Sequence, residues 1–314
     1  MRRLGVILLV FLLVAGTSVT AEDQPKKSWI EAVKDATVAI GTLRTARVKT
    51  PKGEEEKRIF AVVGTGVVMI APGQKEGVPW LVTARHVFYD PAKNWDPDFV
   101  QIRFNWFDQK PVDEYLGITI KLKQNNKHLW LPHRDASVDL VALPLVISIK
   151  DAGRPSVDPI PIQTYATATD LYEGASILAF GYPGAVGPAY WTRAVLRTGI
   201  IAWISPEKPL STTFLIDSLV FPGNSGGPVF KVPTGVDQYG NLNVGGKIAF
   251  LGIISQGRKE ANPLYAGDKA IEMQGPKGTV AVVSEQWVGI GVVEPAERVK
   301  ELLTDAYKSI KDTK

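Results

Sequence analysis

The chain has no cysteine among its 314 residues. Disulfide frameworks, thiol catalysis and cysteine-ligated metal sites are therefore excluded. Histidine is scarce as well: His86, His128 and His133 are the only three, and they lack the spacing of a zinc site. We expect no metal and no other cofactor. Catalysis by an imidazole would have to use one of these three side chains.

A strong charge of either sign is also absent. The net charge is +4 at pH 7, and the basic residues are scattered rather than gathered in a stripe. Such a balance gives little support to nucleic-acid binding. With 45% hydrophobic and 22% charged residues, the composition is that of a soluble globular protein. The length is sufficient to bury a large core without disulfides.

The clearest long apolar run is at the N-terminus. Arg2-Arg3 precede an apolar stretch from Leu4 to Ala15, and Val19-Thr20-Ala21 provide small residues for cleavage. This pattern predicts a secretory signal over residues 1–21. The apolar stretch is shorter than the roughly 20 residues that a membrane helix needs. We expect export to a bacterial periplasm or the cell exterior, with an uncleaved anchor as the alternative and no other membrane contact.

Short β-branched runs separated by Gly, Pro and Asp dominate the rest of the chain. They cover residues 36–43, 59–70, 80–84, 100–104, 116–122, 138–145, 176–180, 194–204, 213–216, 228–231, 247–255 and 279–283. The pattern favours an all-β fold, either an antiparallel barrel or a sandwich. The charged stretch 44–58 is interpreted as a solvated hairpin loop. The stretches 233–246 and 258–278, rich in Gly, Pro and Asn, are interpreted as loops.

Two further patterns divide the chain. The segment 151–162 is rich in Pro and predicts a linker between an N-terminal subdomain, 22–150, and a C-terminal subdomain, 163–293. A helix is predicted over 294–314, because apolar residues recur there at spacings of three and four. Its apolar face consists of Ala296, Val299, Leu303, Ala306 and Ile310. A capping box at residues 28–31 predicts a short helix at the start of the mature chain.

Residues 223–228 read Gly-Asn-Ser-Gly-Gly-Pro. The glycines permit a sharp turn and close approach of a substrate, which presents Ser225 for attack on a carbonyl. The amides of Gly223 and Ser225 are candidates for an oxyanion hole, with Asn224 completing the loop between them. The same letters match the elbow of α/β-hydrolases. That fold needs a histidine after the serine, and none lies there.

His86 is the candidate general base, because it stands where the buried run Leu81–Ala84 ends in a short turn, with only Arg85 between them. Asp139 opens an apolar run, where an unpaired carboxylate would be costly to bury. It is therefore the candidate that orients His86, with Asp135 as the fallback. His128 and His133 are interpreted as structural or merely exposed. In chain order, base, acid and nucleophile follow one of the three familiar orders of catalytic triads.

The segments Gly64–Val67, Thr83–Val87, Asp139–Leu143 and Gly223–Pro228 together resemble the trypsin-like peptidases, and most closely the bacterial HtrA/Deg branch. The resemblance implies two antiparallel six-stranded β-barrels of chymotrypsin type, with the site in the cleft between them. His and Asp would lie on the first barrel and Ser on the second. Only 23 residues follow Gly291, so no PDZ domain is expected. Relatives that are activated by cleavage carry aspartate at the position of Asn224, so we expect no activation of that kind.

The resemblance also implies where a substrate binds. It places Leu219 near the base of the primary specificity pocket and Ser255, Gln256 and Gly257 along its wall, paired with an extended polypeptide. With Gly257 leaving the pocket mouth open, a small or medium apolar side chain is expected before the scissile bond. Asp217 would reverse this preference if its side chain turned inward.

The function expected from these residues is that of an exported serine endopeptidase that works through an acyl-enzyme and takes polypeptide substrates. One alternative is a non-catalytic, protease-like binding protein or chaperone of the cell envelope, its cleft covered by the long segments 87–98 and 258–278. Another is an esterase that uses the same triad.

Overall fold

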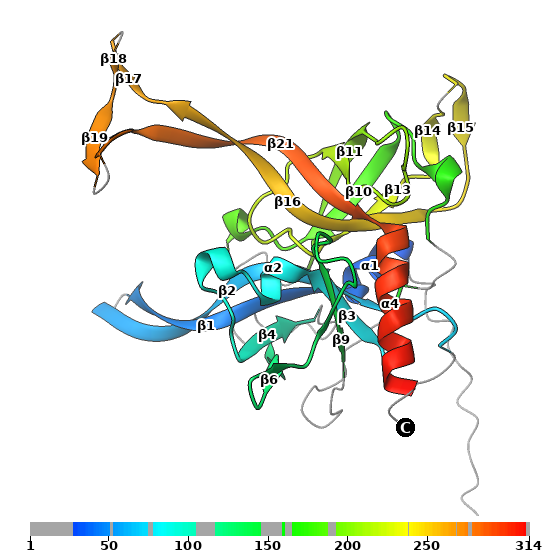
Figure 1. The fold of residues 1–314 in the computed structure, drawn as a ribbon, viewed down its shortest axis with the longest axis horizontal. Helices are drawn as coiled ribbons and strands as arrows, with labels where there is room; N and C mark the ends of the chain where they lie inside the picture. Colours follow the sequence, from blue (N-terminus) through cyan, green and yellow to red (C-terminus); the bar gives the residue numbers. More distant parts are fainter. Residues whose placement is uncertain are drawn as a thin grey trace, which may run out of the picture.

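The computed structural model describes residues 28–50, 53–74, 78–104, 117–145, 159–160, 165–187, 193–237, 239–267, 269–275 and 278–311. The expected signal and most of the expected linker lie outside these residues. Three α-helices are described: α1 (Trp29–Ala36), α2 (Arg85–Phe88) and α4 (Ala296–Lys311). Three short 3-10 turns accompany them: η1 (Pro91–Lys93), η4 (Ala168–Asp170) and η5 (Gly184–Val186). The remaining elements are strands (Figure 1), so the predicted all-β class is confirmed.

The N-terminal half forms one antiparallel sheet in the strand order β5-β4-β1-β2-β3-β9-β8. Its strands are β1 (Thr37–Thr50), β2 (Gly53–Met69), β3 (Trp80–Ala84), β4 (Phe99–Arg103), β5 (Gly117–Lys121), β8 (Leu131–Pro132) and β9 (Leu140–Pro144). The strands β6 (Lys123–Gln124) and β7 (Lys127–His128) form a separate hairpin. This sheet has seven strands and an open order over the described residues, where a closed six-stranded barrel was expected. The extra strand is the short β8, whose Leu131 pairs with Ala142.

The C-terminal half forms a closed antiparallel barrel, β10-β11-β12-β21-β16-β13, with the six strands that the resemblance implied. These are β10 (Ser176–Gly181), β11 (Val195–Trp203), β12 (Phe214–Asp217), β13 (Pro228–Lys231), β16 (Ala249–Pro263) and β21 (Val283–Pro295). Three small hairpins are attached to it. They are formed by β14 (Thr234–Val236) with β15 (Leu242–Val244), β17 (Tyr265–Ala266) with β18 (Lys269–Ala270), and β19 (Glu272–Gly275) with β20 (Gly278–Ala281).

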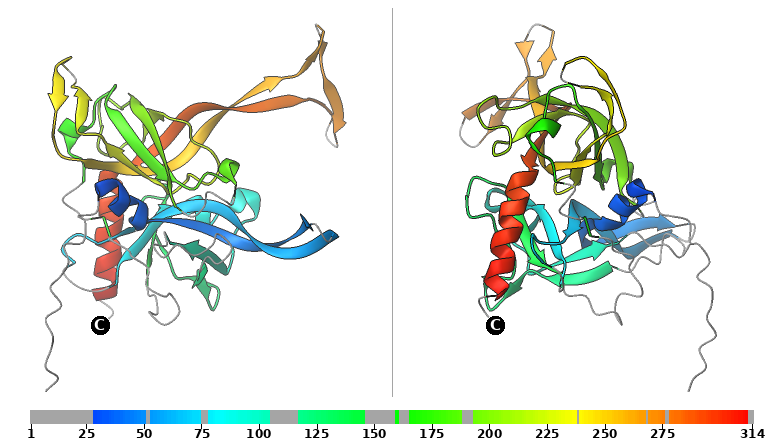
Figure 2. Two further views of the ribbon diagram at one scale, coloured as in Figure 1. Left: turned by 180° about the vertical axis from the view of Figure 1, so that it is seen from behind. Right: turned by 90° about the vertical axis from the view of Figure 1, so that its right-hand side faces the viewer.

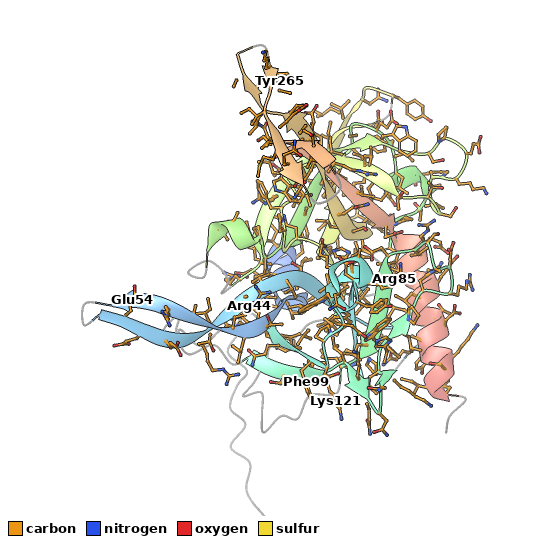
Figure 3. The ribbon with its side chains drawn as sticks, turned by 60° about the vertical axis from the view of Figure 1, so that its left-hand side comes forward. Arg44, Glu54, Arg85, Phe99, Lys121 and Tyr265 are labelled. Atoms are coloured by element: carbon orange, nitrogen blue, oxygen red, sulfur yellow. The ribbon has the colours of Figure 1, made fainter. Side chains whose placement is uncertain are left out.

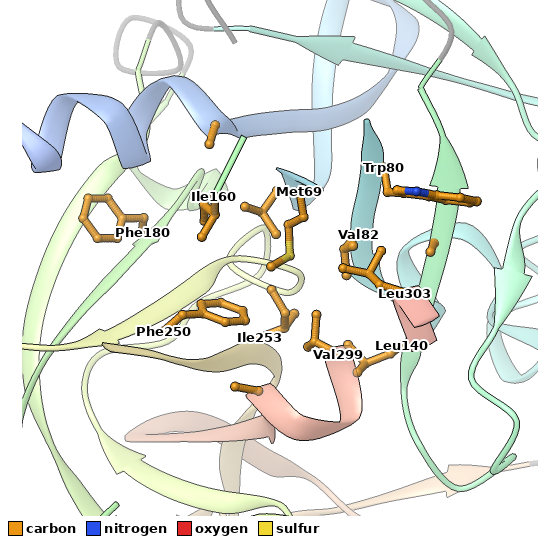
Figure 4. Packing of buried hydrophobic residues seen from close by; sticks show 14 of the residues in the cluster. Met69, Trp80, Val82, Leu140, Ile160, Phe180, Phe250, Ile253, Val299 and Leu303 are labelled. Atoms are coloured by element: carbon orange, nitrogen blue, oxygen red, sulfur yellow. The ribbon is translucent and has the colours of Figure 1, made fainter. Parts of the chain in front are cut away.

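One hydrophobic cluster joins the two sheets and the C-terminal helix (Figure 4). Met69, Trp80 and Leu140 come from the first sheet, Phe250 from the barrel and Leu303 from α4. Each is buried. Burial of a side chain of this size stabilises the fold by about 1.5–3 kcal/mol. This shared core therefore holds the two sheets and the helix together.

Helix α4 confirms the predicted C-terminal helix. The predicted apolar face is buried up to Ala306, but Ile310 is 37% exposed and Leu302 is buried in addition. Leu302 belongs to the core cluster, whereas Ile310 lies in the last turn of the helix (Figure 1). His133, interpreted from the sequence as structural or merely exposed, is buried beneath this helix with its Nε2 3.2 Å from Glu301 Oε2.

Two long β-hairpins project from the body on the same side (Figures 1 and 2). The first is the outer part of β1 and β2, which pair out to Thr50 and Gly53. Residues 44–50 and 53–58 of the expected hairpin loop therefore form paired strands, and Glu54 lies near the tip (Figure 3). The second comprises the outer parts of β16 and β21. The described residues of the expected loop 258–278 belong to this hairpin and the small hairpins at its end, and they extend away from the body instead of covering the cleft.

Candidate active site

His86 and Asp139 are brought together by the pairing of two buried strands. His86 lies in α2, two residues beyond the end of β3, and Asp139 immediately precedes β9. Because β3 and β9 run antiparallel with Ala84 opposite Leu140, the end of one strand meets the start of the other. The backbone N–H of Arg85 donates to Asp139 O at 3.1 Å and closes this corner. The histidine that follows β3 and the aspartate that precedes β9 are thus brought next to each other.

Three donors hold the Asp139 carboxylate. Its Oδ2 lies 2.7 Å from His86 Nδ1 and accepts a hydrogen bond from Ser255 Oγ at 2.7 Å. Its Oδ1 accepts the backbone N–H of His86 at 3.0 Å. Burial by itself would raise the pKa of Asp139, but the hydrogen bonds and the nearby imidazole outweigh it and lower that pKa. An ionised Asp139 fixes the proton of neutral His86 on Nδ1, which leaves Nε2 as the acceptor.

Glu294 supports Asp139 from behind. Its side chain is buried at the end of β21, where Oε1 accepts the backbone N–H of Asp139 at 3.0 Å. Its Oε2 accepts a hydrogen bond from Arg298 Nη1 of α4 at 2.7 Å. The sequence reasoning missed both Glu294 and the contact between Ser255 and Asp139. The available signal was a polar residue at the end of an apolar strand, the same signal that singled out Asp139.

Thr65 of β2 fastens the loop that carries Ser225. Its hydroxyl donates to Gly223 O at 2.6 Å and accepts the backbone N–H of Tyr182 at 3.0 Å. The backbone N–H of Thr65 donates to Ser225 O at 2.7 Å. All three hydrogen bonds cross from the first sheet to the barrel, so the position of the serine depends on both halves of the molecule.

The amides of Gly223 and Ser225 are free to bind a ligand. The carbonyls that precede them are engaged, since Pro222 O accepts Gly184 N–H and Asn224 O accepts Gly227 N–H, both at 2.9 Å. In a trans peptide the N–H points opposite to the C=O. Neither amide has an acceptor within the described residues. Gly223 has φ +97°, a conformation that favours glycine.

Asn224 is not a donor of this site. Its backbone N–H donates to Phe221 O at 3.0 Å, and the residue is buried beneath the loop.

His86, Asp139 and Ser225 line one open cavity of about 820 Å³ between the two sheets. Other lining residues are Asp90, Lys93, Ser137, Phe221, Ser255, Gln256, Gly257, Lys259, Trp287 and Glu294. Both Ser225 and His86 line this cavity, and no hydrogen bond joins Ser225 Oγ to His86 Nε2. Such bonds are often long in unliganded enzymes and shorten when substrate binds.

The structure places the residues expected to form the specificity pocket differently from the arrangement that the resemblance implied. Leu219 is 53% exposed and borders a small closed space instead of the main cavity. The buried Val220 fills the region behind Gly257, and a side chain on Gly257 would meet the Val220 carbonyl and the Trp287 ring. Gly257 itself lines the main cavity. The side chain of Asp217 is exposed, so it does not supply a charge here.

The other titratable groups serve structural contacts. His128 stacks on Trp130, with ring centroids 4.4 Å apart, and its Nε2 lies 3.0 Å from Asp96 Oδ1. Asp135, the fallback acid, accepts hydrogen bonds from Ser137 and does not contact His86. Within the described part of the chain, no three His, Asp or Glu side chains are placed to hold a metal ion.

With this geometry described, the comparisons identify the family. The model of the trypsin-like peptidase domain matches residues 64–236, more than half of the chain, including His86, Asp139 and Ser225. The chain belongs to the trypsin-like peptidase family. This peptidase domain is also similar to a solved structure, the HtrA-type protease AlgW with decapeptide. The TM-score is 0.43 and the identity 19%, over 91% of this chain and 67% of that chain. No curated protein matches the chain.

The trypsin-like peptidase match ends at residue 236. Ser255 and Glu294, which hold Asp139, lie beyond it, as does the ribbon formed by β16 and β21.

Proposed function

We propose that this trypsin-like peptidase is an exported serine endopeptidase that uses His86, Asp139 and Ser225. The observation that carries the proposal is the 2.7 Å contact between His86 Nδ1 and Asp139 Oδ2 in the cavity that also holds Ser225 and two free amides. Nucleophile, base, orienting acid and oxyanion donors are thus present in one place. These are the parts that acyl transfer requires.

In the proposed reaction, Ser225 Oγ attacks the carbonyl carbon of a peptide bond while His86 Nε2 takes its proton. The carbonyl oxygen becomes an oxyanion and accepts the N–H groups of Gly223 and Ser225. The C–N bond then breaks, and the leaving amine takes the proton from His86. Water attacks the resulting ester, giving its proton to Nε2. The C–Oγ bond of the second tetrahedral intermediate then breaks, Ser225 Oγ takes the proton back from Nε2, and the acid is released. Asp139 stabilises the imidazolium in both halves.

The proposed substrates are polypeptides. An extended chain would pair with Ser255, Gln256 and Gly257, which line the cavity next to Ser225. The apolar wall beside them is made by Phe221 and Trp287, whose rings lie edge to face at 6.5 Å. This wall suits the small or medium apolar residue expected before the scissile bond. Leu219 is not part of this proposal.

Export is proposed from the pattern of residues 1–21 alone. Among the described residues, no helix has the length and apolarity needed to cross a membrane.

The test is hydrolysis of a quenched-fluorescence peptide library by purified mature protein. Wild type is expected to cleave, whereas Ser225→Ala and His86→Ala are expected to lose all but a residual rate. Asp139→Asn is expected to lower kcat by about 10⁴-fold. Ser137→Ala is the matched control, because Ser137 lines the same cavity but contacts only Asp135 with its hydroxyl. Equal cleavage by wild type and Ser225→Ala would refute the proposal.

A second candidate is a non-catalytic protein that binds unfolded chains in the same cleft. It is favoured by two observations: Ser225 Oγ has no hydrogen bond to His86 Nε2, and Val220 fills the region behind Gly257. Peptide binding without cleavage by a folded wild type would support this candidate. Cleavage of small esters without any proteolysis would instead indicate an esterase.

A further inference from the structure

The hairpin formed by the outer parts of β16 and β21, called the ribbon below, begins at the candidate active site. β16 and β21 pair from Gly252 and Pro295 out to Pro263 and Val283. Figures 1 and 3 show this ribbon extending well beyond the barrel, with Tyr265 near its tip. The base of the ribbon is part of the cavity wall, formed by Ser255, Gln256, Gly257, Arg258 and Lys259. A single strand therefore leads from the cavity to the tip.

The second edge of β16 loses its partner at the cavity. The last residue bonded on that edge is Ile254, whose N–H donates to Gly227 O at 2.9 Å. From Ser255 to Pro263, β16 has β21 on one edge and no strand on the other within the described residues. Alternate residues of an antiparallel strand turn their N–H and C=O groups to opposite edges. The free edge is therefore a template for another extended chain.

This edge is accessible. Arg258 through Pro263 are exposed. The Lys259 side chain contacts the opposite strand of the ribbon: its Nζ lies 2.6 Å from Glu285 Oε2 and 4.8 Å from the centre of the Trp287 ring. Arg258, Lys259 and Glu260 carry mixed charges. Only the backbone hydrogen-bonding groups continue along the whole free edge of β16. A polypeptide that binds there would therefore be recognised by its extended conformation rather than by a charge motif.

We propose that the free edge of β16 from Arg258 to Pro263 binds the segment of a polypeptide substrate that precedes the scissile bond. The proposal rests on the proposed function and extends it. β16 runs outward from Ser255, so a chain paired antiparallel to it runs inward and reaches Ser225 last. Its N-terminal residues then lie nearest the ribbon tip. The preferred substrate is an unfolded polypeptide with an extended segment before the cleavage site.

The test measures binding and cleavage separately. Labelled peptides share one sequence around the scissile bond and differ in the preceding segment, from one that spans only Ser255–Gly257 to one that reaches Pro263. Binding is measured on Ser225→Ala by fluorescence anisotropy, and cleavage on wild type. The longest peptide is expected to bind at least about tenfold more tightly than the shortest, because the added residues form several net-favourable backbone hydrogen bonds.

N-methylation of single peptide bonds in the longest peptide then distinguishes strand pairing from loose contact. Removal of alternate N–H donors is expected to weaken binding, while the intervening positions tolerate the methyl group. A ribbon in which a two-residue Asn-Gly turn replaces residues 261–285 keeps the pair Glu260 and Gln286. In this variant the gain in affinity should stop at the peptide length that reaches Glu260, and cleavage of the shortest peptide should be unchanged.

Equal affinity for short and long peptides, or no alternation in the N-methyl series, would overturn the inference. Length-dependent binding by Ser225→Ala with no cleavage by wild type would preserve the edge site and refute the endopeptidase proposal. Cleavage by wild type without length-dependent binding would support the endopeptidase proposal and refute the edge site.

Discussion

At the scale of single residues, the account depends on Asp139. Its carboxylate accepts hydrogen bonds from His86 and Ser255, and its own backbone N–H is tied to Glu294. Because these donors fix the Asp139 carboxylate, it can hold the His86 imidazole in one tautomer and one orientation. The same contacts link the chemistry of the site to the stability of the fold.

Asp139→Asn is expected to destabilise the protein in a pH-dependent way. The folded state lowers the pKa of Asp139 below the 3.8 of a free aspartate. The unfolded chain therefore takes up the proton at higher pH, and the stabilisation is fully present above that value and lost as pH falls through the folded pKa. Urea unfolding should show a larger loss for Asp139→Asn at neutral pH than below pH 3.8. An equal loss at both would contradict the assignment.

Thr65 permits a second test at this scale. Thr65→Val removes the hydroxyl that bonds Gly223 O and Tyr182 N–H but keeps the shape of the side chain. We expect a fall in the rate of Ser225 acylation of about 10²-fold, the size seen when an oxyanion donor is lost. Thr65→Ser retains the hydroxyl and should recover most of the rate. If Val and Ser variants behave alike, the Gly223 loop does not depend on this hydrogen bond.

At the scale of elements, the site is a meeting of strand ends. The sequence predicted β3 and the start of β9 closely, because both are short, apolar and bounded by polar residues. It therefore predicted His86 and Asp139 with their correct neighbours. It did not predict that Val220 and Trp287 pack against Gly257, since those contacts join segments distant in the chain. Local patterns carry no information about which distant side chain fills a given space.

Helix α4 provides the test at the element scale. Leu303 is buried in the core that joins the two sheets, whereas Ile310 on the same helix is 37% exposed. Leu303→Ala is expected to lower the free energy of unfolding by about 2–5 kcal/mol. Ile310→Ala, the matched control, should change it by no more than about 0.5 kcal/mol. Equal losses for both, measured by urea denaturation, would show that α4 does not anchor the core.

At the scale of the whole molecule, two sheets share one core, and two hairpins extend beyond it. The sequence predicted the sheets, because alternation and punctuation mark buried strands. It predicted a hairpin loop over 44–58 and a loop over 258–278 but not the long paired strands, because both stretches are charged or interrupted by Gly and Pro. Their strands are stabilised by pairing with each other rather than by burial, and pairing leaves little trace in local composition.

The central claim is that Ser225 is an activated nucleophile, and the most direct measurement is labelling by a fluorescent fluorophosphonate probe. Wild type and Ser225→Ala are compared as folded, purified mature proteins, with the labelled residue identified by peptide mass spectrometry. The account predicts labelling of wild type at Ser225 and none of the variant. A folded wild type that takes up no probe, or takes it up at another residue, would contradict the account.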